Sequence, residues 1–557
     1  MKYSIEKDTS LMKIIEGTLK ENWSSKAFTD YGIKVELEYT YQEVAQHIAR
    51  FHFLFEELGI KPGDRIAICD KNSSNWSISL LSTLTYGAVA VPILNDFNLE
   101  QIENIYEHSE SSLFFCSNRV FTEAERLNKA RMINVADFKP FADDKVMLDA
   151  IENAEKKYNA KFPNGMQPSD VCYKVEDPEA LTLLSYTSGS TGNSKGVMIP
   201  NRALWSNVLF ADAALALEQG SRILSLLPLA HMYGFSFEFL YEFCIGCHVH
   251  FLTKAPSPKI LLGAIAAVRP SLLVAVPLII EKIVRGRVFP LLQTPRMKFM
   301  LSIPGLRNIV HSKIRQQILK AFGGNIYEVV VGGAPLNKEV GDFLARINFP
   351  ITVGYGMTEC APIICYEDWK YFAKGSCGKQ VPRMEVKIDS PDPHNVAGEI
   401  ICKGMNVMLG YYKNPEATAE AIDADGWLHT GDLGTIDRHG NVFIRGRKKS
   451  MLLGANGQNI YPEEIEDKLN SLPMVLESVV IQKGEKLYAL VYPDMEQVKA
   501  LNLGDEELKS IMEQNRKDLN LQIPAYEQIC GVRIMEQEFE KTPKRSIKRF
   551  LYKDAEV

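Results

Sequence analysis

A loop rich in glycine and hydroxyl groups spans residues 186–196 and has the composition of a polyphosphate-binding segment. It follows an apolar run, Leu181–Leu184, that predicts a β-strand. Glycines let backbone N–H groups approach an anion closely, while hydroxyl groups and a lysine supply further donors and a positive charge. The loop therefore predicts an ATP site, and its candidate residues are Thr187, Ser188, Gly189, Ser190, Thr191, Gly192 and Lys195.

A Walker-type P-loop and a flexible linker both agree less well with the residues of this loop. The P-loop pattern, G-x-x-x-x-G-K-[ST], needs a lysine next to its second glycine, whereas Asn193 and Ser194 separate Gly192 from Lys195. A flexible linker is rarely bounded by apolar runs on both sides, such as Leu181–Leu184 and Val197–Ile199. We therefore retain the polyphosphate interpretation.

The composition of the 557-residue chain is that of a globular protein with a large core and several structural units. Its net charge of −6 argues against a nucleic-acid partner. The first residues, Met1–Asp8, lack the apolar stretch of a signal peptide. The most apolar span, Leu261–Ile280, is interrupted by Arg269 and Pro270, so a cytoplasmic location is expected.

Residues 244–248 (CIGCH) match the haem-attachment pattern C-x-x-C-H. No export signal accompanies the pattern, no second group of metal ligands lies near it in the sequence, and the chain continues as an apolar run to Leu252. Patterns this short arise often by chance. We therefore expect a core strand here rather than a haem or zinc site.

Apolar strands alternate with helices from Thr40 to about Leu94, and the alternation returns between Leu181 and Gly354. This pattern predicts βα units and a parallel sheet, whose carboxyl-terminal loops are the usual place for a ligand. The expected strands lie in segments 65–69, 88–93, 181–199, 222–231, 272–277, 328–331 and 351–354.

The pattern changes near Ser376, where short strands and turns predict a β-rich subdomain with strands at 385–388, 398–403, 434–437 and 441–445. After Lys448 we expect a compact α+β tail, with a helix over 461–472 and a hairpin over 476–492. The predicted fold class is α/β. Its large N-terminal domain (1–448) has parallel-sheet α/β subdomains and a β-rich subdomain, and a small α+β domain (449–557) follows.

Five further short blocks follow the loop in order. They are 228–234 (PLAHMYG), 332–335 (GGAP), 354–359 (GYGMTE), 430–432 (TGD), and Arg447 with 454–457 (GANG) and 461–466 (YPEEIE). Each block is a weak motif alone. Together with the loop they resemble the adenylate-forming superfamily of acyl-CoA synthetases, peptide-synthetase adenylation domains and luciferases, over essentially the whole chain and most closely the fatty acyl-CoA synthetases.

The resemblance implies which residues hold the nucleotide besides the loop. They are Gly332, Gly333, Ala334, Pro335, Gly354, Tyr355, Gly356, Met357, Thr358, Asp432 and Arg447. Within this set it implies that Tyr355 stacks on adenine, that Asp432 accepts both ribose hydroxyls, and that Arg447 reaches the ribose or phosphate. Two carboxylate oxygens suit two hydroxyl donors.

The resemblance also implies catalytic roles. Thr358 contacts phosphate and Glu359 binds Mg²⁺, for which a hard carboxylate oxygen is suited. His231 lies in the second block and is counted with them. Lys449 matches a hinge about which the small C-terminal domain acts as a mobile lid between two half-reactions.

The implied reaction has two steps. A carboxylate attacks the α-phosphorus of ATP, and coenzyme A then attacks the acyl-adenylate. Residues 274–277 (VAVP) and the helix after them resemble the acyl-pocket wall of fatty acyl-CoA synthetases, so a fatty acid is the expected substrate. An acyl-carrier-protein synthetase and a catalytically impaired protein that only binds acyl-adenylate or ATP are the alternatives.

The family's last motif, K-T-x-x-G-K-I, is altered in this chain. Residues 541–547 read KTPKRSI, which places Ser546 at the position of the lysine that contacts the α-phosphate. A neutral hydroxyl cannot neutralise the developing charge, and loss of one such contact costs roughly 10²–10³ in rate. Lys544 and Lys548 share the face of Ser546 on a strand, but each is displaced by roughly 7 Å. Slow adenylation is therefore expected.

A basic segment lies between Lys282 and Gly324, with nine Lys or Arg residues and no Asp or Glu, interspersed with apolar residues. Such a segment can form weak peripheral contact with anionic lipid. A solvated basic surface is the alternative.

Overall fold

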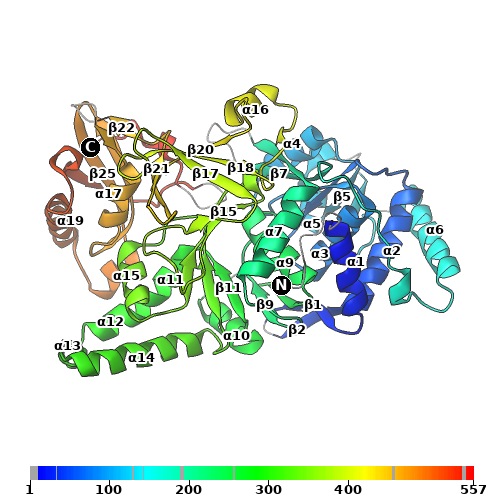
Figure 1. The fold of residues 1–557 in the computed structure, drawn as a ribbon, viewed down its shortest axis with the longest axis horizontal. Helices are drawn as coiled ribbons and strands as arrows, with labels where there is room; N and C mark the ends of the chain where they lie inside the picture. Colours follow the sequence, from blue (N-terminus) through cyan, green and yellow to red (C-terminus); the bar gives the residue numbers. More distant parts are fainter. Residues whose placement is uncertain are drawn as a thin grey trace.

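The computed structural model describes residues 10–32, 34–127, 131–141, 144–187, 194–254, 258–453, 458–541 and 547–556. Figure 1 shows a large body built from the amino-terminal and central elements, with the carboxyl-terminal elements, coloured orange to red, at one end. The α-helices are α1 (Leu11–Glu21), α2 (Tyr41–Glu57), α3 (Ser74–Tyr86), α4 (Leu99–Ser109), α5 (Asn118–Glu123), α6 (Lys145–Lys161), α7 (Asn201–Ala214), α8 (Met232–Phe235), α9 (Tyr241–Cys244), α10 (Pro258–Val268), α11 (Pro277–Ile283), α12 (Phe289–Leu292), α13 (Pro295–Ser302), α14 (Pro304–Ala321), α15 (Lys338–Arg346), α16 (Pro415–Ala421), α17 (Pro462–Leu469), α18 (Met495–Ala500) and α19 (Asp505–Asn520).

The first of two seven-stranded sheets has the order β19-β8-β7-β4-β3-β5-β6. Its strands are β3 (Arg65–Cys69), β4 (Val89–Pro92), β5 (Leu113–Cys116), β6 (Met132–Asn134), β7 (Leu181–Thr187), β8 (Lys195–Pro200) and β19 (Gly410–Tyr411). Strands β3 to β7 run parallel, as the βα alternation predicts, whereas β8 and β19 are antiparallel. The strand predicted after the polyphosphate loop is therefore confirmed as a hairpin partner of β7.

The second seven-stranded sheet has the order β13-β12-β11-β9-β10-β1-β2 and is parallel except for β2. Its strands are β1 (Lys26–Tyr31), β2 (Val35–Thr40), β9 (Arg222–Ser225), β10 (His248–Leu252), β11 (Leu272–Ala275), β12 (Glu328–Val331) and β13 (Ile351–Val353). Because strand side chains alternate between faces, Leu272 and Val274 join the large core shared with the first sheet, while Leu273 and Ala275 join a second core on the opposite face.

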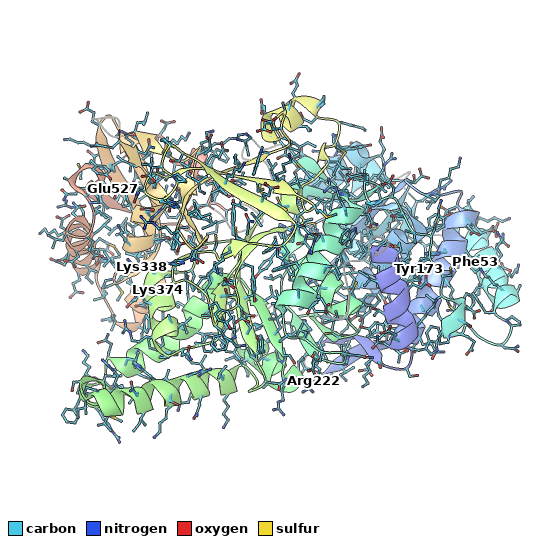
Figure 2. All side chains as sticks on the ribbon, in the orientation of Figure 1. Phe53, Tyr173, Arg222, Lys338, Lys374 and Glu527 are labelled. Atoms are coloured by element: carbon cyan, nitrogen blue, oxygen red, sulfur yellow. The ribbon has the colours of Figure 1, made fainter. Side chains whose placement is uncertain are left out.

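Aromatic packing fills the large core. The ring of Phe28 lies 5.5 Å from that of Phe243 and 5.6 Å from that of Phe251. Cys244 and Cys247 are fully buried beside these rings, and the strand expected after them is confirmed as β10. On the outside of this core, Tyr173 donates its backbone N–H to Glu16 of α1 at 3.1 Å, and Figure 2 shows the two segments adjacent.

The β-rich part of the large body consists of two small sheets. The three-stranded sheet contains β14 (Tyr355–Gly356), β15 (Ile363–Tyr366) and β16 (Lys379–Gln380), and the four-stranded sheet contains β17 (Met384–Asp389), β18 (Gly398–Gly404), β20 (Leu428–Ile436) and β21 (Val442–Arg447). The expected strand at 434–437 is thus too short. The strand begins at Leu428 because Leu428 and His429 pair with β18 and Asp432 pairs with β21, so the block 430–432 lies on a strand.

The carboxyl-terminal elements form a separate core around a three-stranded sheet. The strands of this sheet are β24 (Val475–Lys483), β25 (Lys486–Pro493) and β26 (Ile529–Ile534), and β22 (Leu452–Leu453) and β23 (Asn459–Ile460) form a separate two-stranded sheet. The predicted hairpin is confirmed, but the helix expected over 461–472 ends at Leu469. Pro473 disfavours the helical conformation at Leu472, and the chain turns there instead.

Side-chain contacts join these elements to the large body. Arg285 donates to the carbonyl oxygen of Asn470 at 2.8 Å, Asn337 donates to the hydroxyl of Ser471 at 2.8 Å, and Arg445 lies 3.3 Å from the carboxylate of Glu464. In the part of the chain that the structure describes, no helix is long and apolar enough to cross a membrane.

Substitution of Gly356 tests how closely the backbone packs around β14. A Cβ on Gly356 would collide with the backbone carbonyl oxygen of Pro362, which no side-chain rotation can move. Gly356→Ala should therefore lower the free energy of unfolding by about 1–3 kcal/mol, measured by chemical denaturation. Gly263→Ala on exposed α10, where a Cβ meets nothing, is the control and should be neutral or stabilising. Equal stability of the two variants would contradict the argument.

Candidate active site

Two glycines follow β12 at the carboxyl edge of the second sheet. Gly332 donates to the carbonyl oxygen of Ala275 at 3.3 Å, and a Cβ on it would lie 3.1 Å from the ring of Tyr233 and 3.4 Å from the carbonyl oxygen of Gly354. Gly333 has a φ of +80°, which favours glycine. Gly332 is buried between β11 and β13, whereas Gly333, Ala334 and Pro335 are exposed.

Asp432 is a buried carboxylate at the centre of the predicted nucleotide site. The Tyr355 hydroxyl donates to one of its oxygens at 2.7 Å, and Arg447 Nε donates to the other at 2.8 Å. Asp432 and Arg447 are directly opposite on β20 and β21, so strand register brings them together. The structure thus joins the residues predicted for adenine, ribose and phosphate in one contact network.

Burial raises the pKa of Asp432, and the Arg447 guanidinium opposes this shift. Burial and the adjacent carboxylate raise the pKa of Tyr355 well above its ordinary value, so its hydroxyl stays protonated and remains a donor. A carboxylate has about four lone-pair positions, and these two contacts use two of them. Asp432 therefore retains acceptor capacity for two further hydroxyl groups.

Glu359, the predicted metal ligand, lies in a short 3₁₀ helix with Thr358, which is buried. Its carboxylate accepts a hydrogen bond from the Tyr411 hydroxyl at 2.9 Å. The ammonium group of Lys195 lies 4.8 Å from the centre of the same tyrosine ring, within cation–π range. Tyr411 therefore connects the predicted phosphate lysine with the predicted metal ligand.

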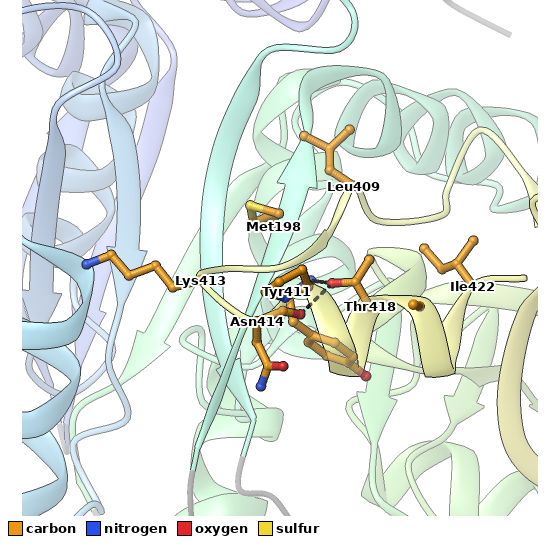
Figure 3. A pocket seen from close by; sticks show the side chains of 9 residues that line it. Met198, Leu409, Tyr411, Lys413, Asn414, Thr418 and Ile422 are labelled. Atoms are coloured by element: carbon orange, nitrogen blue, oxygen red, sulfur yellow. Dashed lines mark hydrogen bonds between the residues drawn. The ribbon is translucent and has the colours of Figure 1, made fainter.

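The environment of Glu359 fits a hydrated Mg²⁺, because its carboxylate is half-buried and a cation for phosphate lies close by. Figure 3 shows Tyr411 beside an open pocket, where Thr418 accepts the Tyr411 backbone N–H at 2.9 Å. Met198, Leu409 and Ile422 line the same pocket. The tyrosine is thus held at its backbone by α16 and at its hydroxyl by Glu359.

Part of the predicted phosphate loop lies outside the described residues. Thr187 ends β7, and Lys195 begins β8 directly opposite it. The residues between them that lie outside are Ser188, Gly189, Ser190, Thr191, Gly192 and Asn193.

His231 caps the amino terminus of α8, and the loop before it is held by two side chains. Asn72 donates to the carbonyl oxygen of Leu227 at 2.6 Å and accepts from the N–H of Leu229 at 2.9 Å. Glu238 accepts from the N–H groups of Leu226 and Leu227 at 2.9 and 2.7 Å. His231 is therefore presented by a loop that is fixed by Asn72, which follows β3, and by Glu238, which lies in the helical segment after α8.

The predicted hinge, Lys449, is exposed in the turn after β21. Its neighbour Lys448 donates its backbone N–H to Gly431 at 2.9 Å and its ammonium group to Glu399 at 2.9 Å. Glu399 is buried and also accepts from His429 at 3.1 Å and from the N–H of Gly431 at 3.0 Å. Burial alone would raise the pKa of Glu399, but these contacts lower it, so this carboxylate is an ionised anchor beside the hinge.

The altered carboxyl-terminal motif lies mostly outside the described residues, including Lys544 and Ser546. Lys548 is described and lies 3.3 Å from the carboxylate of Glu540. Arg549 pairs with Glu466 and lies 3.6 Å from Glu463. The structure therefore places Lys548 within the carboxyl-terminal unit and not beside Asp432 or Glu359.

Four positioning residues were not predicted from the sequence: Tyr411, Glu399, Asn72 and Glu238. Tyr411 and Glu359 are 52 positions apart, and Asn72 and Leu229 are 157 apart. No short motif spans such distances. Glu238 was detectable in part, since an acid inside an apolar aromatic run signals a buried, hydrogen-bonded carboxylate.

Comparison with protein families gives two matches. A family model described as AMP-binding enzyme matches residues 21–412. A second, described as AMP-binding enzyme C-terminal domain, matches residues 449–554.

Individual proteins similar to this chain include two acyl ligases. The long-chain-fatty-acid–CoA ligase FadD15 of Mycobacterium bovis is 28% identical over 558 residues, covering 92% of this chain and 89% of the relative. A long-chain-fatty-acid–[acyl-carrier-protein] ligase of Arabidopsis thaliana is 26% identical, covering 86% and 76%. The anthranilate CoA ligase AuaEII in complex with anthranoyl-AMP has the same fold, with a TM-score of 0.78, 19% identity and coverage of 98% and 97%.

Removing the charge of Glu399 tests its role beside the hinge. In Glu399→Gln the anchor for Lys448 is lost, so trypsin should cut after Lys448 or Lys449 faster than in the unaltered protein. Loss of hydrogen bonds to a buried charged group should also lower the free energy of unfolding by about 1–3 kcal/mol. Limited proteolysis with mass spectrometry of the fragments and thermal unfolding measure both effects.

The control is Glu385→Gln, at an exposed position on β17 of the same sheet. It should leave cleavage and stability unchanged. If both variants are cut at the same rate, Glu399 does not hold the turn.

Proposed function

The chain belongs to the AMP-binding enzyme family, and we propose that it activates a fatty acid with ATP and transfers the acyl group to coenzyme A. The family assignment makes it an AMP-forming acid–CoA ligase. One observation supports fatty acid activation with ATP best. The residues assigned to adenosine and the residues assigned to the phosphates and Mg²⁺ lie close together, just after the carboxyl end of β13. Tyr355 binds Asp432, and four residues later Glu359 binds Tyr411 beside Lys195.

In the first half-reaction an oxygen of the fatty acid carboxylate forms a bond to the α-phosphorus of ATP, and the bond from that phosphorus to the pyrophosphate oxygen breaks. Binding and orientation carry most of the catalysis, because the reacting groups are held in line and water is excluded. We assign Asp432 to the ribose hydroxyls, Tyr355 and the Gly332–Gly333 backbone to the adenine, and Lys195 with the loop to the phosphates.

Glu359 is the residue we assign to Mg²⁺, oriented by Tyr411. When bound, the ion neutralises charge on the leaving pyrophosphate. Thr358 and His231 are assigned to the substrate phosphate and carboxylate. In the second half-reaction the coenzyme A sulfur forms a bond to the acyl carbon, the bond from that carbon to the phosphate oxygen of AMP breaks, and AMP leaves together with the thiol proton, which passes to solvent.

An apolar acid is favoured by the surroundings of Gly332. The ring of Tyr233 touches this glycine position, Phe237 lies 6.4 Å from Tyr233, and Phe210 lies 6.3 Å from Phe237. Val276 follows β11 and packs against the same core. An aromatic and aliphatic wall therefore adjoins the predicted position of the carboxylate, as a fatty acid requires.

We further propose that the chain divides at Lys448/Lys449 into an AMP-binding domain (1–448) and a lid (449–557) that rotates about Lys449. The support is that Lys449 is exposed in a tight turn, while Glu399 anchors the residue before it. In domain hinges, a few loop residues such as this one absorb the change in backbone dihedral angles.

The direct test is ATP-dependent AMP release across a panel of carboxylic acids, with coenzyme A or with an acyl carrier protein as acceptor. Release that depends on a fatty acid and coenzyme A supports the proposal. Thioester formation only on the carrier protein would assign the alternative ligase activity. ATP or acyl-adenylate binding without AMP release would assign a binding protein.

Tyr411→Phe tests the assignment of Glu359 to Mg²⁺. Loss of the hydroxyl leaves Glu359 less well oriented, so the Mg²⁺ concentration for half-maximal AMP release should rise about tenfold. The control is Tyr412→Phe, because the Tyr412 hydroxyl bonds Glu110 at 3.2 Å on the protein surface. An unchanged Mg²⁺ dependence in Tyr411→Phe, or an equal change in the control, would contradict the assignment.

Ser546→Lys tests the proposed cause of slow adenylation. Restoring a lysine at this position should raise ATP–pyrophosphate exchange by roughly 10²–10³, while thioester formation from synthetic acyl-adenylate changes little. Ser546→Gln supplies length without charge and should give no such gain. Exchange that is already fast in the unaltered protein and insensitive to Ser546→Lys would show that the serine is not limiting.

A further inference from the structure

The basic segment folds into a helical hairpin whose end exposes large apolar side chains. We call residues 289–309, which include α12, α13 and the start of α14, the tip. Its four exposed apolar side chains are Leu291 (58% exposed), Phe299 (66%), Ile303 (38%) and Ile309 (51%). They come from α12, α13, the residue between α13 and α14, and α14, so all parts of the tip contribute.

The base of the hairpin is fixed to the body, which separates it from the tip. Val284, Val288, Ile314 and Ile318 pack with the second core, on the face of the sheet formed by Leu273 and Ala275. In Figure 1 the hairpin forms the lower margin of the molecule, and in Figure 2 its side chains project downward where no other ribbon lies in this view. The tip is therefore presented on a rigid support.

The charge around the tip has one sign. Arg296, Lys298 and Arg307 are exposed on α13 and α14, among the described residues none of the three forms an ion pair, and the sequence from Lys282 to Gly324 contains no acidic residue. The exposed apolar side chains have an unfavourable hydration free energy, and together with the cations they suit the boundary between anionic headgroups and acyl chains. The apolar groups enter the boundary, and the cations remain with the phosphates.

We propose that the tip docks on an anionic lipid bilayer, with Leu291, Phe299, Ile303 and Ile309 inserted at the level of the headgroups. The docking follows from apolar exposure and charge complementarity and does not depend on the reaction. Its use, which is to take fatty acid directly from the membrane, rests on the proposed function. An acidic protein partner is the competing occupant, and it needs no apolar insertion.

The test uses the full chain and sedimentation with vesicles, either of pure phosphatidylcholine or of equal parts phosphatidylcholine and phosphatidylglycerol. The unaltered protein should bind the anionic vesicles and bind the neutral ones at least tenfold more weakly, on the order of the effect of two or three cations. In Phe299→Trp the tryptophan emission should shift to shorter wavelength with anionic vesicles only, which reports insertion.

Two double variants separate the two kinds of contact. Phe299→Gln with Ile309→Gln should weaken binding about tenfold or more through lost apolar burial. Arg296→Glu with Lys298→Glu should weaken it about as much, and chiefly at low salt. The controls are Leu521→Gln, which removes an exposed apolar side chain (86% exposed), and Lys486→Glu, an exposed cation, both in the carboxyl-terminal unit. Both controls should bind normally.

Absence of binding to both vesicle types would overturn the proposal, as would equal binding by the tip variants and the controls. Binding to an acidic carrier protein with no emission shift on vesicles would also overturn it and assign the competing occupant. A second assay distinguishes failure of the docking proposal from failure of the proposed function. It measures AMP release with a detergent-solubilised fatty acid, and the tip variants should keep full activity in it.

Discussion

Burying a carboxylate costs several kcal/mol unless donors replace the lost water, and Asp432 meets this condition with two donors from different parts of the chain. Tyr355 comes from β14 of the three-stranded sheet, and Arg447 comes from β21, the strand next to Asp432 in the four-stranded sheet. The same contacts that satisfy Asp432 therefore hold the three-stranded and four-stranded sheets together. The proposed nucleotide site and the joint between these two sheets share one side chain.

The proposed hinge lies directly after this joint. Arg447 is the last residue of β21, so the strand cannot shift without breaking its bond to Asp432. Immediately after it, Lys448 is fixed by Glu399, a second buried carboxylate, on β18 of the same sheet. These two anchors are the structural reason to propose that rotation begins at Lys449. On this proposal the fixed side of the hinge is the proposed nucleotide site.

Local sequence patterns were sufficient to predict much of the fold and the candidate site residues that lie in short motifs. The strands at 65–69 and 328–331 agree with the structure to the residue, because apolar runs between turn residues have few alternatives. Tyr355, Glu359 and Asp432 were predicted as site residues for a related reason, since each belongs to a compact block. What the sequence could not predict were pairings between distant segments. Tyr411 reaches Glu359 only because β19 adds to the edge of the first sheet, and β20 extends to Leu428 only because its neighbours pair with it.

The pairing of β1 with β10 has a consequence for biosynthesis. Phe28 lies opposite Val249, so more than two hundred residues are synthesised after β1 before its partner strand β10 exists. At typical rates of translation that interval is roughly ten to forty seconds. During it, Ala27 and Phe28, both fully buried in the finished protein, have only β2 and α1 near them in sequence. The amino-terminal strand therefore stays without its partner on the nascent chain long enough for a chaperone to bind it.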